Sequence, residues 1–165
     1  MDKEKNSGDI LMDELRQLAT ITEGSNMGDF YRYRLESAKV VKIVPCREVL
    51  TKDQISLIKK VIKPKKKECY KNALMMAKMM DCTYCEGMMY CYYGIDHAFN
   101  KVGDKYIDIT KEFALGEDPT AEYVVFGEYT PEDAHNAMVE KGCYGNVFGW
   151  LYAKAKRTES KITTK

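Results

Sequence analysis

Cys69, His97 and Asp108 have the side-chain types, and the order along the chain, of a nucleophilic triad. The sequence places Cys69 at the first turn of a predicted helix, where unpaired backbone N–H groups and the helix dipole favour a thiolate. The same N–H groups are suited to hold an oxyanion during a reaction. In such a triad the histidine transfers the proton, and the carboxylate fixes the tautomer and orientation of the imidazole. These three residues are therefore predicted to be catalytic.

His97 and Asp108 are predicted to lie in the two strands of a tight hairpin that turns at Gly103 and Asp104. Antiparallel pairing around that turn places residue 110 opposite His97. Asp108 is then two positions away on the same face, because side chains alternate along a strand. We therefore expect its carboxylate to reach the imidazole ring.

Three helices are predicted in the part of the chain that precedes this hairpin. Apolar residues at helical spacing indicate a helix over residues 8–24 and another that begins near Cys69. Thr51 and Gln54 form a capping-box pattern, which opens a helix that ends before Pro64.

Further elements complete an α+β domain, in which the helix of Cys69 packs on a small antiparallel sheet. Thr130 opens another helix, because proline and two acidic residues follow it, and Gly142 ends that helix. Strands are predicted at residues 38–44, 83–93, 97–102, 105–110 and 121–129, with Gly94 ending the second of them.

The chain is expected to form one domain over residues 1–165. The expected parts are an N-terminal helix and strand at 8–50, a catalytic core at about 51–130, C-terminal helices at 130–155, and disordered ends at 1–7 and 156–165.

Four short segments together resemble the transglutaminase-like enzymes of the papain-related cysteine enzyme superfamily. They are Cys69-Tyr-Lys-Asn-Ala73, Glu86-Gly87, His97-Ala-Phe99 and Asp108-Ile-Thr110. The same segments resemble a group of small phage and bacterial proteins with a Cys-His-Asp set, and the likeness covers roughly residues 68–111. The family usually has tryptophan where this chain has Phe99 and proline where it has Ile109.

The resemblance implies a papain/transglutaminase-like core and a thiol-dependent acyl-transfer enzyme that needs no cofactor. A thiolate attacks an amide carbonyl to form a thioester, which water or an amine then resolves. Water makes the enzyme a peptidase, amidase or deamidase, whereas an amine makes it a transglutaminase. The substrate would be a protein or peptide, a host protein among the candidates. The alternative is a non-catalytic phage or mobile-element protein of the same fold that binds and inhibits a host protein.

Three further residues are candidates for support or substrate contact around the triad. Asn72 lies one helical turn after Cys69, and Glu86 lies on the strand predicted behind that helix. Lys67 belongs to a lysine-rich stretch before Cys69, which adds a positive field near the thiol. The same stretch also fits an ordinary solvated helix end.

The other cysteines and the second histidine, His135, give little indication of a functional site. Cys82, Cys85, Cys91 and Cys143 could in principle form a zinc site, but only one pair has the close spacing of zinc ligands. Cys85 and Cys91 are expected on one core-facing side of a strand. No metal is therefore expected, and His135 is interpreted as a surface or packing residue.

Composition excludes several classes of protein. Lys and Arg number 26 and Asp and Glu 25, so the formal net charge of +1 points to no particular partner. Basic residues are not interleaved with aromatic ones, as a nucleic-acid platform requires. No apolar run approaches the ~20 residues that span a bilayer, and the N-terminus lacks a signal-peptide pattern. We expect a cytoplasmic protein, in the host cytoplasm if phage-encoded, with free thiols; its oligomeric state stays open.

Overall fold

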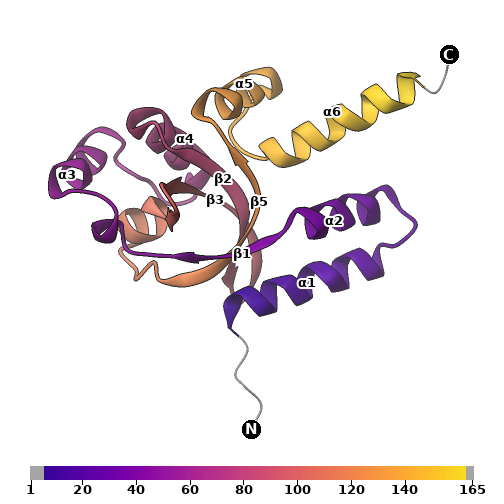
Figure 1. Cartoon of the computed structure of the whole chain (residues 1–165), viewed down its shortest axis with the longest axis horizontal. Helices are drawn as coiled ribbons and strands as arrows, with labels where there is room; N and C mark the ends of the chain where they lie inside the picture. Colours follow the sequence, from indigo (N-terminus) through magenta and orange to yellow (C-terminus); the bar gives the residue numbers. More distant parts are fainter. Residues whose placement is uncertain (1–5, 163–165) are drawn as a thin grey trace, which may run out of the picture.

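The computed structural model describes residues 6–162 and combines helices with a closed five-stranded barrel (Figure 1). The α-helices are α1 (Ser7–Ile21), α2 (Asn26–Ser37), α3 (Lys52–Val61), α4 (Cys69–Met80), α5 (Pro131–Lys141) and α6 (Val147–Ile162). A short 3₁₀ helix, η1 (Cys46–Glu48), and a π-helix, η2 (Thr110–Leu115), complete the helical elements. Among residues 6–162 no helix combines the length and apolarity that crossing a membrane requires.

The strands close into a barrel in the order β1-β4-β3-β2-β5, and β1 then pairs with β5. They are β1 (Lys39–Ile43), β2 (Thr83–Cys91), β3 (Tyr93–Val102), β4 (Lys105–Ile107) and β5 (Ala121–Tyr129). The prediction of a small antiparallel sheet is correct for four of the five strand pairs, but the sheet closes into a barrel through one parallel pair. The N-terminal β1 inserts between β5 and β4 and pairs with β4 in parallel. The sheet therefore includes a strand from outside the expected core at 51–130.

The hairpin of β3 and β4 has the predicted turn but a shorter second strand. Asn100 pairs with Ile107, and Gly103 in the turn has a φ of +62°, a conformation that glycine adopts without strain. However, β4 ends at Ile107, and the chain turns into η2. Asp108 thus follows the strand instead of lying within it.

The hairpin of β2 and β3 turns earlier than expected. β2 ends at Cys91 and the turn is at Tyr92, which has a φ of +63°. Gly94, predicted to end the strand, lies inside β3. A Cβ there would come within 2.2 Å of the Met88 side chain and 2.4 Å of the Glu14 carboxylate. Glycine at this position lets α1 pack closely against the hairpin.

Helices cover both sides of the barrel. α4 packs against β3 and β2 on one side, whereas α1 and α2 form a hairpin against β5 on the other (Figure 1). α6 extends beside α2, where the rings of Tyr33 and Tyr152 lie 4.8 Å apart. The barrel interior is filled by strand side chains alone: Val41, Ile43, Cys85, Met89, Phe99, Tyr106, Tyr123 and Val125.

The predicted capping residues of two helices are confirmed. Thr51 and Gln54 form the complete capping box of α3, and Thr130 caps α5, which ends at Gly142 with a φ of +84°. The prediction of a disordered tail at 156–165 is wrong for residues 156–162, which continue α6. Ser7, expected in a disordered end, begins α1. Residues 1–5 and 163–165 lie outside the described residues.

Candidate active site

Cys69 is the first residue of α4, and its side chain is half-buried. Glu68, the residue that precedes the helix, makes no side-chain capping hydrogen bond. Thr51 and Thr130, by contrast, cap α3 and α5 with their hydroxyl groups. The first N–H groups of a helix have no partner within the helix. The first N–H groups of α4, next to the Cys69 thiol, therefore have no side-chain cap.

His97 lies in β3, on the strand face that also carries Phe99 into the barrel interior. Its Nε2 is 2.7 Å from Oδ2 of Asp108, and both side chains are buried. The Cys69 thiol is close enough to the same imidazole to contribute to its pKa. Because Nε2 contacts the carboxylate, Nδ1 is the ring nitrogen left for the sulfur. The structure thus brings the three predicted residues together at one end of the barrel.

The charge state of His97 reflects its partners. Burial alone would lower the pKa of the imidazole. The negative charge and hydrogen bond of Asp108, together with Cys69, outweigh burial and raise the pKa of His97 to about 10. Burial would raise the pKa of Asp108, but the imidazolium and four hydrogen bonds hold it below its usual value. At neutral pH the pair is an imidazolium and a carboxylate.

The Asp108 carboxylate is held from three directions. The backbone N–H groups of Thr110 and Lys111 each donate to Oδ1 at 3.0 Å, at the start of η2. The Tyr123 hydroxyl donates to Oδ2 at 2.8 Å, and its ring meets the His97 ring edge-on. Tyr123 is not among the residues that the sequence motifs single out. Its position in a predicted strand could have indicated this role, because a tyrosine buried there needs a polar partner for its hydroxyl group.

Asn72 connects three segments around the triad. Its Nδ2 donates to the carbonyl oxygen of Lys65 at 2.9 Å and to Oγ1 of Thr110 at 3.0 Å. Its Oδ1 accepts from the Lys65 N–H at 3.3 Å. Asn72 therefore fixes the segment before Cys69 and the turn after Asp108 to the same helix. It contacts none of the three triad side chains through these bonds.

Glu86 faces away from the barrel interior, and its carboxylate supports α6. It accepts from the N–H groups of Val147 and Phe148 at 2.9 Å each, and from the Tyr84 hydroxyl at 2.7 Å. Burial raises the pKa of Glu86, although these hydrogen bonds oppose the shift. These hydrogen bonds join β2 to the start of the C-terminal helix α6, which gives Glu86 a structural role. It also borders the small cavity beside His97.

That small cavity has a volume of about 10 Å³, which is room for roughly one water molecule. Tyr70 and Asn146 contribute to its wall beside His97. Arg34, also in the wall, forms a two-pronged ion pair with Asp96 at 2.8 and 2.9 Å. This pair ties α2 to the residue that precedes His97.

The lysines before Cys69 are exposed, and two of them have unusual backbone conformations. Lys63 and Lys67 have φ values of +50° and +64°. Residues other than glycine, asparagine and aspartate rarely adopt this left-handed backbone conformation. Lys67 projects from the loop two residues before the thiol.

The remaining cysteines form no cluster around a metal. Cys85 is buried in the barrel interior, but Cys91 is exposed, so the prediction that the two share a core-facing side is wrong for Cys91. Cys82 is buried and Cys143 is exposed. Within residues 6–162 there is no group of three or more metal-ligating Cys, His, Asp or Glu side chains.

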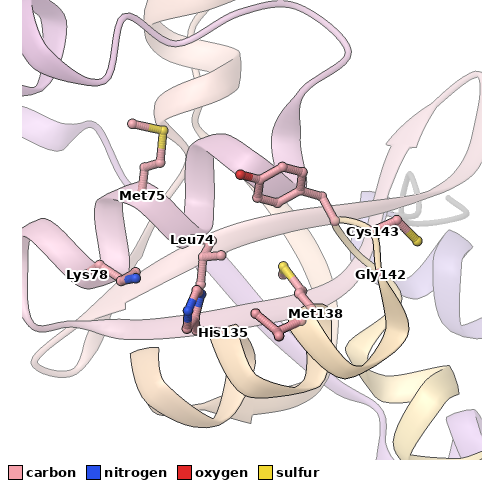
Figure 2. A pocket seen from close by; sticks show the side chains of 9 residues that line it. Leu74, Met75, Lys78, His135, Met138, Gly142 and Cys143 are labelled. Carbon is pink, nitrogen blue, oxygen red and sulfur yellow. The ribbon is translucent and has the colours of Figure 1, made fainter.

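A larger hollow of about 610 Å³ lies between α4 and α5 (Figure 2). In Figure 2 the side chains of Leu74 and Lys78 from α4 face those of His135 and Met138 from α5 across it. His135, interpreted as a surface or packing residue, thus lines a groove. The groove ends at the loop after Gly142 and does not include the triad.

Comparisons of the chain with protein-family models, with curated proteins and with solved structures give no match. The fold and the site define a mixed α/β protein with a Cys-His-Asp cluster at a helix N-terminus. The likeness to transglutaminase-like enzymes rests on the motif residues alone.

Proposed function

We propose that this protein is a thiol-dependent acyl-transfer enzyme that acts on amide bonds of a protein or peptide. Cys69 is the nucleophile, His97 the proton-transfer group and Asp108 the group that orients it. We also propose that α4 with β2, β3 and β4 corresponds to a papain/transglutaminase-like core, to which β1 adds a closing strand.

The observation that carries this proposal is the 2.7 Å contact between His97 Nε2 and Asp108 Oδ2, with the Cys69 thiol at the start of α4 close enough to affect the same imidazole. Two features support it. The raised pKa of His97 keeps the imidazole protonated at neutral pH, so that it can donate a proton to a leaving nitrogen. The start of α4 has no side-chain cap, so its N–H groups are available to an oxyanion.

In the first half-reaction the Cys69 thiolate attacks the amide carbonyl carbon, and a C–S bond forms. The carbonyl oxygen takes the negative charge and is stabilised by the N–H groups at the start of α4. The C–N bond then breaks as the His97 imidazolium donates its proton to the leaving nitrogen. The product is a thioester on Cys69 with neutral His97.

In the second half-reaction His97 accepts a proton from water or from a primary amine, which attacks the thioester carbon. The C–S bond breaks, and the thiolate and imidazolium return to their starting states. Water gives hydrolysis, and an amine gives amide transfer. Asp108 holds Nε2 throughout, so Nδ1 stays directed at the sulfur.

The test is a screen of glutamine-containing and other peptides followed by mass spectrometry and ammonia release, with a fluorescent primary amine present in half of the reactions. Hydrolysis of a side-chain amide adds about 1 Da and releases ammonia, whereas transfer attaches the amine. Cys69→Ala and His97→Ala should each abolish the reaction. Exchange of the exposed Cys91 for alanine is the matched control and should leave the rate unchanged.

A second candidate function is binding without catalysis, for example as a phage or mobile-element protein that inhibits a host protein. The apolar groove between α4 and α5 favours it, because that groove offers a binding surface separate from the triad. If Cys69→Ala retains the full biological effect of the chain, this candidate replaces the enzyme.

A further inference from the structure

Six lysines lie along the last turn of α3 and the loop that leads from it to Cys69. We call them the lysine loop: Lys59, Lys60, Lys63, Lys65, Lys66 and Lys67. Residues 59–67 contain no aspartate or glutamate, although acidic and basic residues are nearly equal in number over the whole chain. All six side chains are exposed.

Several lysines elsewhere on the surface pair with carboxylates. Lys39 and Lys101 both contact Glu128, and Lys154 contacts Glu140. Over residues 6–162 no carboxylate oxygen lies within 4.0 Å of any of the six lysine-loop ammonium groups. The loop therefore presents a local positive charge that the described part of the chain does not neutralise.

The loop is held in a defined place relative to the triad. Asn72 bonds both backbone groups of Lys65 and also Thr110, two residues after Asp108. The Cα of Lys67, two residues before Cys69, lies within about 7 Å of the Cα of Cys69, given the spacing of consecutive Cα atoms. Lys63 and Lys67 keep left-handed backbone conformations, which residues of this kind rarely adopt.

We propose that the lysine loop binds the acidic side chains of a peptide whose scissile amide lies at Cys69, so that the enzyme acts on acidic protein segments. This inference rests on the proposed function and names its substrate class. A peptide explains the features better than a nucleic acid does. The loop contains no arginine for two-pronged phosphate contacts and no aromatic residue on which bases could stack.

Binding is tested in the Cys69→Ala chain, which holds a substrate without turning it over. The probes are two fluorescein-labelled peptides with a central glutamine, one flanked by glutamates and one in which every glutamate is replaced by glutamine. Fluorescence anisotropy at low and high salt measures the Kd of each. The glutamate peptide should bind at least tenfold more tightly at low salt, and the difference should shrink as salt screens the charges.

A matched pair of triple variants locates the binding surface. Lys63→Gln, Lys66→Gln and Lys67→Gln together should raise the Kd of the glutamate peptide at least fivefold. Lys65 is left unchanged because Asn72 holds its backbone. Lys42→Gln, Lys105→Gln and Lys161→Gln remove the same charge from exposed positions elsewhere and should leave that Kd within twofold of the parent value.

Five outcomes would overturn one of the two proposals. Equal Kd values for the two peptides, or equal effects of the two triple variants, overturn the lysine-loop proposal. A single-stranded oligonucleotide of equal charge that binds more tightly than the glutamate peptide also overturns it. Turnover by the unaltered chain separates the two proposals. Binding without turnover overturns the enzyme function, whereas turnover without a charge preference overturns the substrate class alone.

Discussion

The hydroxyl group of Tyr123 donates a hydrogen bond to Oδ2 of Asp108, the same oxygen that contacts Nε2 of His97. The distances are 2.8 and 2.7 Å. β5 thereby holds the carboxylate from the side opposite η2, whose N–H groups bind the other oxygen. The orientation of the imidazole depends on residues from three separate segments of the chain.

Removal of the Tyr123 hydroxyl should slow the reaction without abolishing it. Tyr123→Phe deletes one hydrogen bond to a charged group, which is worth about 1.5–3 kcal/mol, so we expect a roughly tenfold lower kcat with little change in KM. Tyr106→Phe is the control, because the Tyr106 hydroxyl bonds Glu128 instead of Asp108. It should lower stability to urea but not kcat. Equal kcat losses in the two variants would show that Tyr123 acts only through stability.

Cys69 should react with iodoacetamide faster than the other five cysteines near neutral pH, because the thiolate is the reactive form. Cys91 and Cys143 are the informative comparison, since both are more exposed than Cys69. Mass spectrometry of peptides after brief labelling measures the order. His97→Gln should remove the advantage of Cys69. Labelling of all three thiols at one rate in the native chain would argue against an activated nucleophile.

Asp108→Asn should leave the fold intact and reduce turnover by up to about 10⁴-fold, the cost of the wrong imidazole tautomer in another triad. Steady-state kinetics with an identified substrate provides the measurement. The double variant of Cys69→Ala and His97→Ala should be no slower than either single variant, because residues that act as one unit are not additive. Additive losses would mean that the two side chains work independently.

The His97–Asp108 pair should make stability depend on pH in the alkaline range. The folded-state pKa of His97, about 10, lies above the unfolded value of 6.5, so the imidazolium contributes its full stability below pH 6.5. That contribution is lost as pH rises through about 10. Urea unfolding of the parent chain and of His97→Gln should therefore show a free-energy difference that falls between these values. A difference constant with pH would mean that His97 is neutral in the folded chain.

The Glu86 carboxylate should matter for α6 more than for the chemistry. The N–H groups of Val147 and Phe148 donate to different oxygens of Glu86, so the N–H₂ group of Glu86→Gln would face one of these donors, and we expect a loss of about 1–3 kcal/mol of stability. Hydrogen exchange at these two amides should accelerate, while kcat changes less than in Tyr123→Phe. A larger fall in kcat than in stability would instead place Glu86 at the substrate.

Local sequence patterns determined much of the arrangement around the triad. The capping box at Thr51, the glycine turn at Gly103 and the cap at Thr130 each depend on residues within a few positions, so their outcome follows from local backbone chemistry. The pairing of β3 with β4 follows from that turn, and it brings Asp108 near His97. Even there the sequence could not show that β4 ends at Ile107.

Only the tertiary structure decided which distant segments complete the site. The insertion of β1 between β4 and β5 closes the barrel, but a β-branched segment at 39–43 carries no information about its partners. Tyr123 contacts Asp108, and Glu86 contacts α6, although these partners are too far apart in the sequence for a helical or strand repeat to predict the contact. Such contacts depend on how whole elements pack, because a buried polar group forms a hydrogen bond with whichever partner the fold brings close enough.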